Sequence, residues 1–135
     1  MKQIQNKTMF INFSNHDISD PDSKTYIEEQ AKTASAYGEI VFIKFPHVDP
    51  MGDEDYIQTL AIENIEKIMA HIIDKEHDVV HIMGELNLVY KMVTMLKELG
   101  VTCIASTTTR IAEEDLVKGK VKKESEFEFH RFRKY

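Results

Sequence analysis

The segment that decides the fold is Val101-Thr102-Cys103-Ile104-Ala105-Ser106-Thr107-Thr108-Thr109-Arg110. It begins as an apolar, β-branched run typical of a buried strand, and it ends in four hydroxyl side chains and an arginine. In a parallel α/β sheet the carboxyl ends of the strands line the ligand-binding crevice. The segment therefore predicts a strand over 101–106 whose polar end lies at such a crevice.

Other apolar runs alternate with helical patterns along the rest of the chain. The expected strands are 9–14, 39–45, 78–83 and 101–106, and the expected helices are 22–37, 53–75 and 86–99. Asp22 and Ser23 are N-cap candidates for the first helix, and Gly38 and Gly100 are stop signals. A period of two over 127–132 predicts a last strand, at a sheet edge or antiparallel, after a charged loop over 113–125.

This alternation predicts one three-layer α/β domain. We expect a Rossmann-like fold over residues 9–135, with a mostly parallel sheet covered by helices on both faces, after a polar leader over 1–8. The chain has 135 residues, enough for a single core.

Composition restricts the class of partner. The formal net charge is −6, which argues against binding to long nucleic acid. No apolar run approaches the ~20 residues that cross a bilayer, so no membrane segment is expected. Cys103 is the single cysteine, so an internal disulfide is impossible, and a cytoplasmic location is expected.

Polar residues follow the first and last strands of the expected parallel sheet. Ser14, Asn15 and His16 follow the first strand, and His16 is a candidate general acid because its reference pKa lies near neutrality. After the last one, Ser106, Thr107, Thr108 and Thr109 are candidate phosphate-binding hydroxyls, and Arg110 a candidate phosphate clamp. The alternatives are a tight turn at Asn15 and threonines that cap a helix beside an exposed arginine.

Two further loops contribute weaker candidates. Gly84 allows close backbone approach, while Glu85 and Asn87 would point into the crevice, unless they only begin a helix. His47 lies in a Pro-bounded loop and is expected at most at the wall of the pocket.

Several chemistries lack their motif in this sequence. There is no HExxH, paired CxxC or carboxylate triplet, so no metal is expected, and the six histidines are more simply core or surface residues. There is no GxGxxG, GxxxxGK[ST] or GxSxG either, so we expect no dinucleotide cofactor, P-loop or nucleophile elbow.

Three segments together resemble a known family. They are 9–16, 38–41 and 105–110, and in order and spacing they are similar to the small CRISPR-associated ring nucleases, Rossmann-like proteins that degrade cyclic oligoadenylate. The resemblance implies a cytoplasmic homodimer that binds the ring, most often of four adenylates, across its two-fold axis. It also implies metal-independent cleavage in which a ribose 2′-hydroxyl attacks the adjacent phosphate.

Site roles follow from the same resemblance. Ser14, Asn15 and His16 would contact ribose and phosphate, and Thr107 to Arg110 would hold phosphate. The family has no uniform catalytic residue, so the assignment of His16 as the acid comes from its side-chain chemistry and not from the resemblance. The leading hypothesis is thus a cyclic-oligoadenylate phosphodiesterase. The alternatives are a sensor or sponge that binds the ring without cleaving it, and an interaction protein whose polar strand ends only cap helices.

Overall fold

The structure, a computed structural model, describes residues 8–117 and 120–135, so most of the expected leader over 1–8 lies outside the described residues. The elements, in chain order, are β1 (Met9–Ser14), α1 (Glu28–Tyr37), β2 (Glu39–Lys44), α2 (Glu54–Met69), β3 (Val79–Ile82), α3 (Leu86–Glu98), β4 (Thr102–Val117) and β5 (Lys120–Lys134).

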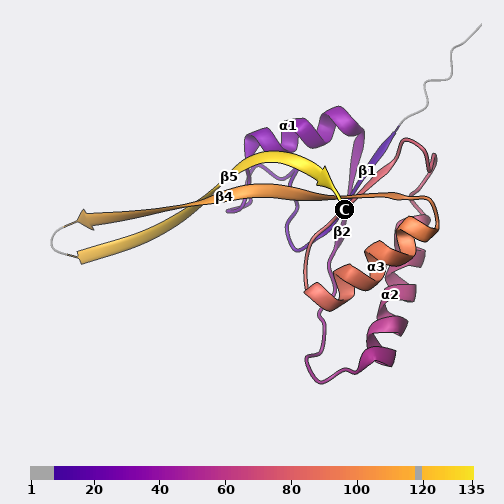
Figure 1. The fold of residues 1–135 in the computed structure, drawn as a ribbon. Helices are drawn as coiled ribbons and strands as arrows, with labels where there is room; N and C mark the ends of the chain where they lie inside the picture. The colour runs from indigo at the N-terminus through magenta and orange to yellow at the C-terminus, as the bar shows by residue number, and fades with distance from the viewer. Residues whose placement is uncertain (1–7, 118–119) are drawn as a thin grey trace, which may run out of the picture.

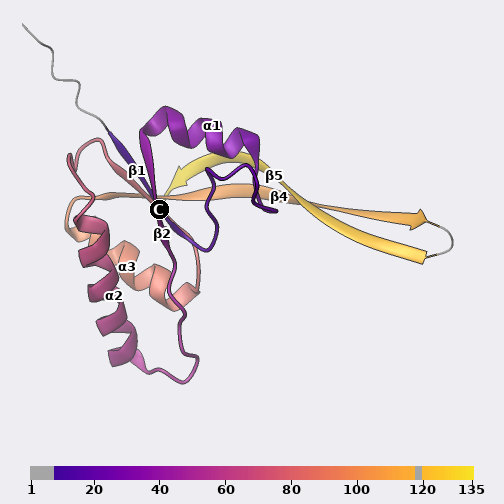
Figure 2. The same cartoon turned by 180° about the vertical axis from the view of Figure 1, so that it is seen from behind.

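One sheet organises the molecule. Its strand order is β2-β1-β3-β4-β5, with the first four strands parallel and β5 antiparallel to β4. Helix α1 covers one face, and α2 and α3 cover the other (Figures 1 and 2). The three-layer Rossmann-like prediction is therefore confirmed. In this strand order the direction of winding reverses between β1 and β3, which places a ligand crevice at their carboxyl ends.

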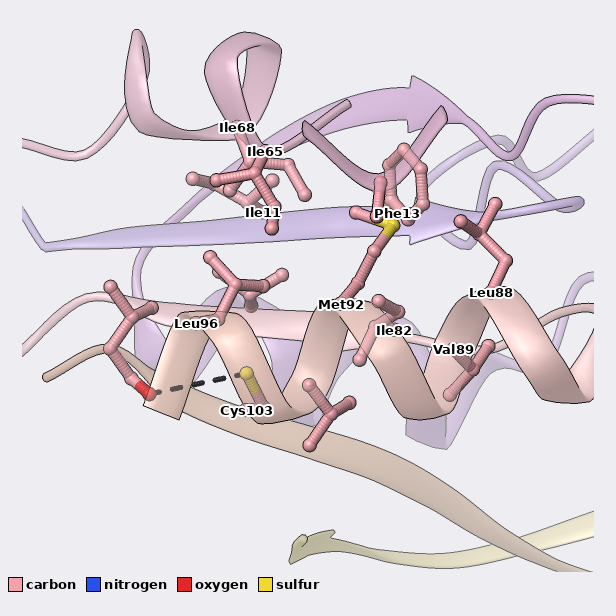
Figure 3. Packing of buried hydrophobic residues seen from close by; sticks show 14 of the residues in the cluster. Ile11, Phe13, Ile65, Ile68, Ile82, Leu88, Val89, Met92, Leu96 and Cys103 are labelled. Atoms are coloured by element: carbon pink, nitrogen blue, oxygen red, sulfur yellow. Dashed lines mark hydrogen bonds between the residues drawn. The ribbon is translucent and has the colours of Figure 1, made fainter. Parts of the chain in front are cut away.

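Each face of the sheet has its own apolar core. On the α2–α3 face, Met92 and Leu96 of α3 point toward Ile11 and Phe13 of β1 (Figure 3). Cys103 belongs to this core, and burial raises the pKa of its thiol to about 11. The α1 face is smaller and more aromatic, with its centre at Phe10, Phe129 and Phe132.

Strand β4 does not end at Ser106. It continues to Val117, so the prediction of a strand end at residue 106 is wrong, and so is the expected loop over 113–125. Threonine is a strong strand former, and Thr107, Thr108 and Thr109 continue the ladder against β5. The two strands extend as a long hairpin beyond the helices (Figures 1 and 2).

A β-bulge interrupts this hairpin near the body of the domain. Thr107 pairs with Arg131, but Thr108 pairs with Phe129, so His130 is the extra residue of β5. The extra residue shifts by one position the alternation of β5 side chains between the two faces of the sheet. Both Phe129 and Phe132 are therefore buried in the α1-face core. A strict period of two over 127–132 would place Phe129 and Phe132 on opposite faces of the strand. That prediction is therefore wrong.

Two helices are shorter than their sequence patterns. Helix α1 begins at Glu28 and not near Asp22, because Asp20 and Ser23 accept hydrogen bonds from the backbone N–H groups of Asp22 and Thr25 in local turns. Helix α2 begins at the N-cap Asp53 and ends at Met69, before the expected residue 75. Within residues 8–117 and 120–135, no helix has the length and apolarity that crossing a bilayer would require.

Candidate binding pocket at the carboxyl edge of the sheet

A pocket of about 310 Å³ opens on the α1 face, at the carboxyl ends of β1 and β3 and beside β4. Its size is at the lower end of the range for small-molecule sites. Its described lining residues are Ser14, Asn15, His16, Ile18, Thr25, Ile27, Gln30, His81, Met83, Gly84, Ser106, Thr108 and Phe127. This is the crevice that the strand order predicts.

The pocket brings together about half of the candidates from the sequence. The loop after β1 contributes Ser14, Asn15 and His16, the loop after β3 contributes Gly84, and β4 contributes Ser106 and Thr108. Gly84 has a packing reason to be glycine: a Cβ there would lie 2.5 Å from the ring of buried Phe45.

Three residues of the predicted phosphate clamp are not among the described lining residues. Because β4 is a continuous strand, successive side chains alternate between its two sides. Thr107 donates its hydroxyl to Arg131 O at 3.0 Å, and Thr109 Oγ1 lies 2.5 Å from His130 Nε2. Arg110 is exposed and lies farther along the hairpin.

The remaining candidates lie elsewhere. Glu85 is the N-cap of α3 and accepts hydrogen bonds from Asn87 N and Leu88 N at 3.1 and 2.9 Å, so the helix-start alternative accounts for it. Asn87 lines a separate cavity between the first turns of α2 and α3. His47 is exposed in the loop after β2, and it too is outside the described lining of the pocket.

Strand periodicity assembles the polar floor of the pocket. Residues two apart in a strand point to the same side, so Asn12 and Ser14 share the α1 face with Phe10, and Ser106 shares it with Ile104. In the parallel register Asn12 lies beside His81, and His81 beside Ile104. The floor is therefore fixed by the register of three neighbouring strands.

These polar side chains form one hydrogen-bonded chain. Asn12 Nδ2 donates to His16 O at 2.8 Å, and Asn12 Oδ1 lies 3.0 Å from Nδ1 of His81. Nε2 of His81 lies 2.6 Å from Ser106 Oγ, which also accepts from Gln30 Nε2 at 2.9 Å.

The donors in this chain can be assigned from chemistry alone. A backbone carbonyl only accepts, so the NH₂ group of Asn12 must face His16 O and its oxygen must face His81. Nδ1 of His81 therefore carries the proton, and Nε2 accepts the hydroxyl hydrogen of Ser106. The chain is thus a run of neutral donors and acceptors with a fixed direction.

His81 is a buried core histidine, one of the two alternatives that the sequence left open, but its place in the pocket lining was not expected. It is only 2% exposed and packs against the rings of both Phe10 and Phe132, at centroid distances of 5.8 and 5.4 Å. Burial lowers its pKa to about 4, so the ring is neutral near pH 7. A signal was present in the sequence: a histidine inside an apolar strand needs a polar partner, and Asn12 interrupts the neighbouring strand.

Apolar and polar groups occupy different parts of the pocket. Ile18, Ile27, Met83 and Phe127 supply apolar lining, whereas the buried floor is Ser14 and His81 with Ser106 beside them. The described lining includes no lysine or arginine. In the described part of the chain, no group of three His, Cys, Asp or Glu residues is placed to hold a metal ion.

The fold and the pocket define an α/β domain of the doubly wound class with a pocket at its switch point. A protein-family model, the uncharacterized protein MJ1673 family, matches residues 8–133, and the chain belongs to this family. Comparison with curated proteins and with solved structures found no match.

Proposed function

We propose that this protein binds a cyclic oligoadenylate, with one nucleoside of the ring in the pocket, and cleaves it to linear products that end in a 2′,3′-cyclic phosphate. One observation carries the proposal: a pocket at the carboxyl ends of β1 and β3 joins apolar walls to a neutral polar floor and a polar mouth. A nucleotide has the matching parts, namely a flat base and a charged ribose-phosphate. The sequence resemblance to ring nucleases supports the same ligand.

His16 is the proposed general acid. Its backbone is held in place, because His16 N donates to Ser14 Oγ at 3.3 Å and His16 O accepts from both Asn12 and Ser14. The side chain is exposed and belongs to the pocket lining. In the proposed reaction the 2′-oxygen loses its proton to solvent and bonds to phosphorus, the bond from phosphorus to the 5′-oxygen breaks, and protonated His16 gives its proton to that oxygen.

A homodimer is part of this proposal. A ring with two-fold symmetry offers two equivalent faces, and a C2 dimer presents the same pocket twice to match them. Sedimentation of the protein with and without ring measures this directly. A monomer in both conditions would contradict a shared site.

The test of the proposed reaction uses purified protein, EDTA, and cyclic tri-, tetra- and hexa-adenylate, with the products separated by mass spectrometry. We expect linear products with a 2′,3′-cyclic phosphate end. The His16→Ala variant should be slower by about 10²-fold or more, the usual contribution of a general acid. His47→Ala is the matched control, because His47 is an exposed histidine outside the described lining of the pocket.

A second function, binding without cleavage, is favoured by one observation. The described lining contains no lysine or arginine to stabilise the extra charge of a phosphoryl transition state. A sponge or sensor of this kind would leave the ring intact and raise the melting temperature of the protein. Intact rings without a thermal shift would exclude both functions.

A further inference from the structure

The hydroxyl hydrogens at the pocket floor are already used inside the protein. Ser106 gives its only hydroxyl hydrogen to Nε2 of His81, and one of its lone pairs accepts from Gln30. Ser14 directs its hydrogen to Asn12 Oδ1 at 2.7 Å, with His16 O as a second acceptor at 3.0 Å. Neither serine has a hydrogen left for a ligand, so each can only accept a hydrogen bond from one.

The direction of these hydrogen bonds excludes a phosphate group from the floor of the pocket. A phosphodiester oxygen also only accepts hydrogen bonds, and it would face the lone pairs of Ser14 and Ser106 with no hydrogen between them. The occupant of the floor must instead carry a donor. The mouth, where Asn15, His16 and Thr25 lie, is left for the charged part of the ligand.

The walls restrict the shape of the occupant. Ile18, Ile27 and Phe127 present apolar surface to the same space, and aromatic and aliphatic side chains of this kind pack against the faces of a heterocyclic base. A flat ring that carries a hydrogen-bond donor at its edge satisfies both the walls and the floor.

We infer that the pocket recognises the amino-bearing edge of a heterocyclic base, as in adenine, with the exocyclic amino group donating to Ser106 Oγ. The inference rests on the proposed function, because it names the part of the ligand that enters the same pocket. A base with a carbonyl in that position, such as hypoxanthine, would place a hydrogen-bond acceptor against the lone pair of Ser106. The hydrogen bond from the base to Ser106 Oγ would then be lost.

The first experiment compares three nucleosides by calorimetric titration of the full chain. Adenosine and 2′-deoxyadenosine should bind with similar affinity, and inosine about tenfold or more weaker, the scale of one unmade buried hydrogen bond. Equal affinity for adenosine and inosine would overturn the inference. Loss of binding on removal of the 2′-hydroxyl would assign the donor to ribose and overturn it as well, and so would the absence of adenosine binding at millimolar concentration.

Two further measurements keep the inference independent of any one variant. Ser106→Ala should reduce the adenosine-to-inosine ratio toward one, whereas Thr94→Val, which removes a hydroxyl on exposed α3 surface, should keep it. In the unmodified protein, ¹⁵N NMR of His81 should show a protonated Nδ1 and a bare Nε2 near pH 7. The opposite tautomer would free the Ser106 hydrogen and overturn the argument.

The outcomes separate this inference from the proposed function. A protein that prefers adenosine to inosine but leaves cyclic oligoadenylate intact supports the inference and contradicts the nuclease. A protein that cleaves the ring but binds the two nucleosides equally supports the nuclease and contradicts the inference.

Discussion

Ser106 Oγ lies 2.6 Å from Nε2 of His81, and Asn12 holds the other ring nitrogen at 3.0 Å. The order serine, histidine, amide or carboxylate is also that of hydrolases with an activated serine. Two features separate this group from such a triad. Burial lowers the pKa of His81 to about 4, which makes it a weak base, and Asn12 carries no charge to stabilise an imidazolium. The group is better suited to hold Ser106 in one orientation.

The pKa of His81 predicts a dependence of stability on pH. The unfolded chain binds a proton at His81 near pH 6.5, but the folded chain does so only near pH 4, so acid favours unfolding. The stability from neutral His81 is fully present above pH 6.5, declines as the pH falls from 6.5 to 4, and amounts to roughly 3 kcal/mol over that interval.

Urea denaturation between pH 4 and pH 8 measures this effect. Other groups titrate in the same range, including His77, whose pKa is raised by its hydrogen bond to Asp74. The comparison is therefore with His81→Phe, which fits the ring contacts with Phe10 and Phe132 but cannot titrate. Parallel pH profiles for the two proteins would show that His81 has an ordinary pKa.

Two phenylalanines of β5 should separate folding from binding. Phe132 is buried and packs against Phe10, Tyr37, Phe129 and His81, so Phe132→Ala should lower the free energy of unfolding by about 3–5 kcal/mol. Phe127 is 55% exposed and lines the pocket, so Phe127→Ala should change stability by less than about 1 kcal/mol. Thermal melts and nucleoside titration of both variants test this pair, and unchanged binding by Phe127→Ala would remove that residue from the proposed site.

The carboxylate of Asp78 should be a major structural group. It is fully buried and accepts hydrogen bonds from Met9 N, Ile73 N and Asp74 N at 2.8, 2.7 and 2.9 Å, which joins the start of β1 to the loop before β3. Asp78→Ala leaves one buried and two partly buried N–H groups without their acceptor, and we expect a loss of about 3 kcal/mol in chemical denaturation. Asp17→Ala, which removes an exposed turn contact with Ser19, is the control and should cost far less.

Arg110 allows a test of where phosphate binds. If the base occupies the pocket and the phosphates lie outside it, Arg110→Ala should weaken binding of cyclic tetra-adenylate by about 1.5–3 kcal/mol and leave adenosine binding unchanged. Titration of both ligands against the variant distinguishes the two sites. A loss of adenosine affinity would place Arg110 at the nucleoside pocket itself.

The sequence predicted the parallel part of the sheet well, because apolar runs mark its strands, both the fully buried β1 and the partly exposed edge strand β2. The sequence also indicated where the crevice lies, because the expected strands 9–14 and 101–106 each end in a serine, Ser14 and Ser106. The end of β4 was mispredicted, because Thr107 to Thr109 have the same hydroxyls whether they bind a ligand or pair with another strand. Only the partner β5, distant in the chain, decides between the two.

The polar floor was the hardest part to predict. Neither His81 nor Asn12 belongs to a recognisable motif in the sequence. They form a hydrogen bond only because the register of β1 and β3 brings together two residues that are 69 positions apart. Local patterns carry no information on that register. A polar residue in each of two buried strands is a detectable signal, but the sequence does not show that the two positions are adjacent.

The single extra residue at His130 decides which side chains of β5 face the core. Along β5 the α1 face is occupied by Phe132 on one side of the bulge and by Phe129 and Phe127 on the other, whereas β4 alternates without interruption. Because Thr108 already pairs with Phe129, deletion of His130 would restore a regular ladder and leave Phe129 on the face that it already occupies. The bulge is thus what allows Phe129 and Phe132, three residues apart in β5, to face the same core, while Phe127 beyond it still lines the pocket.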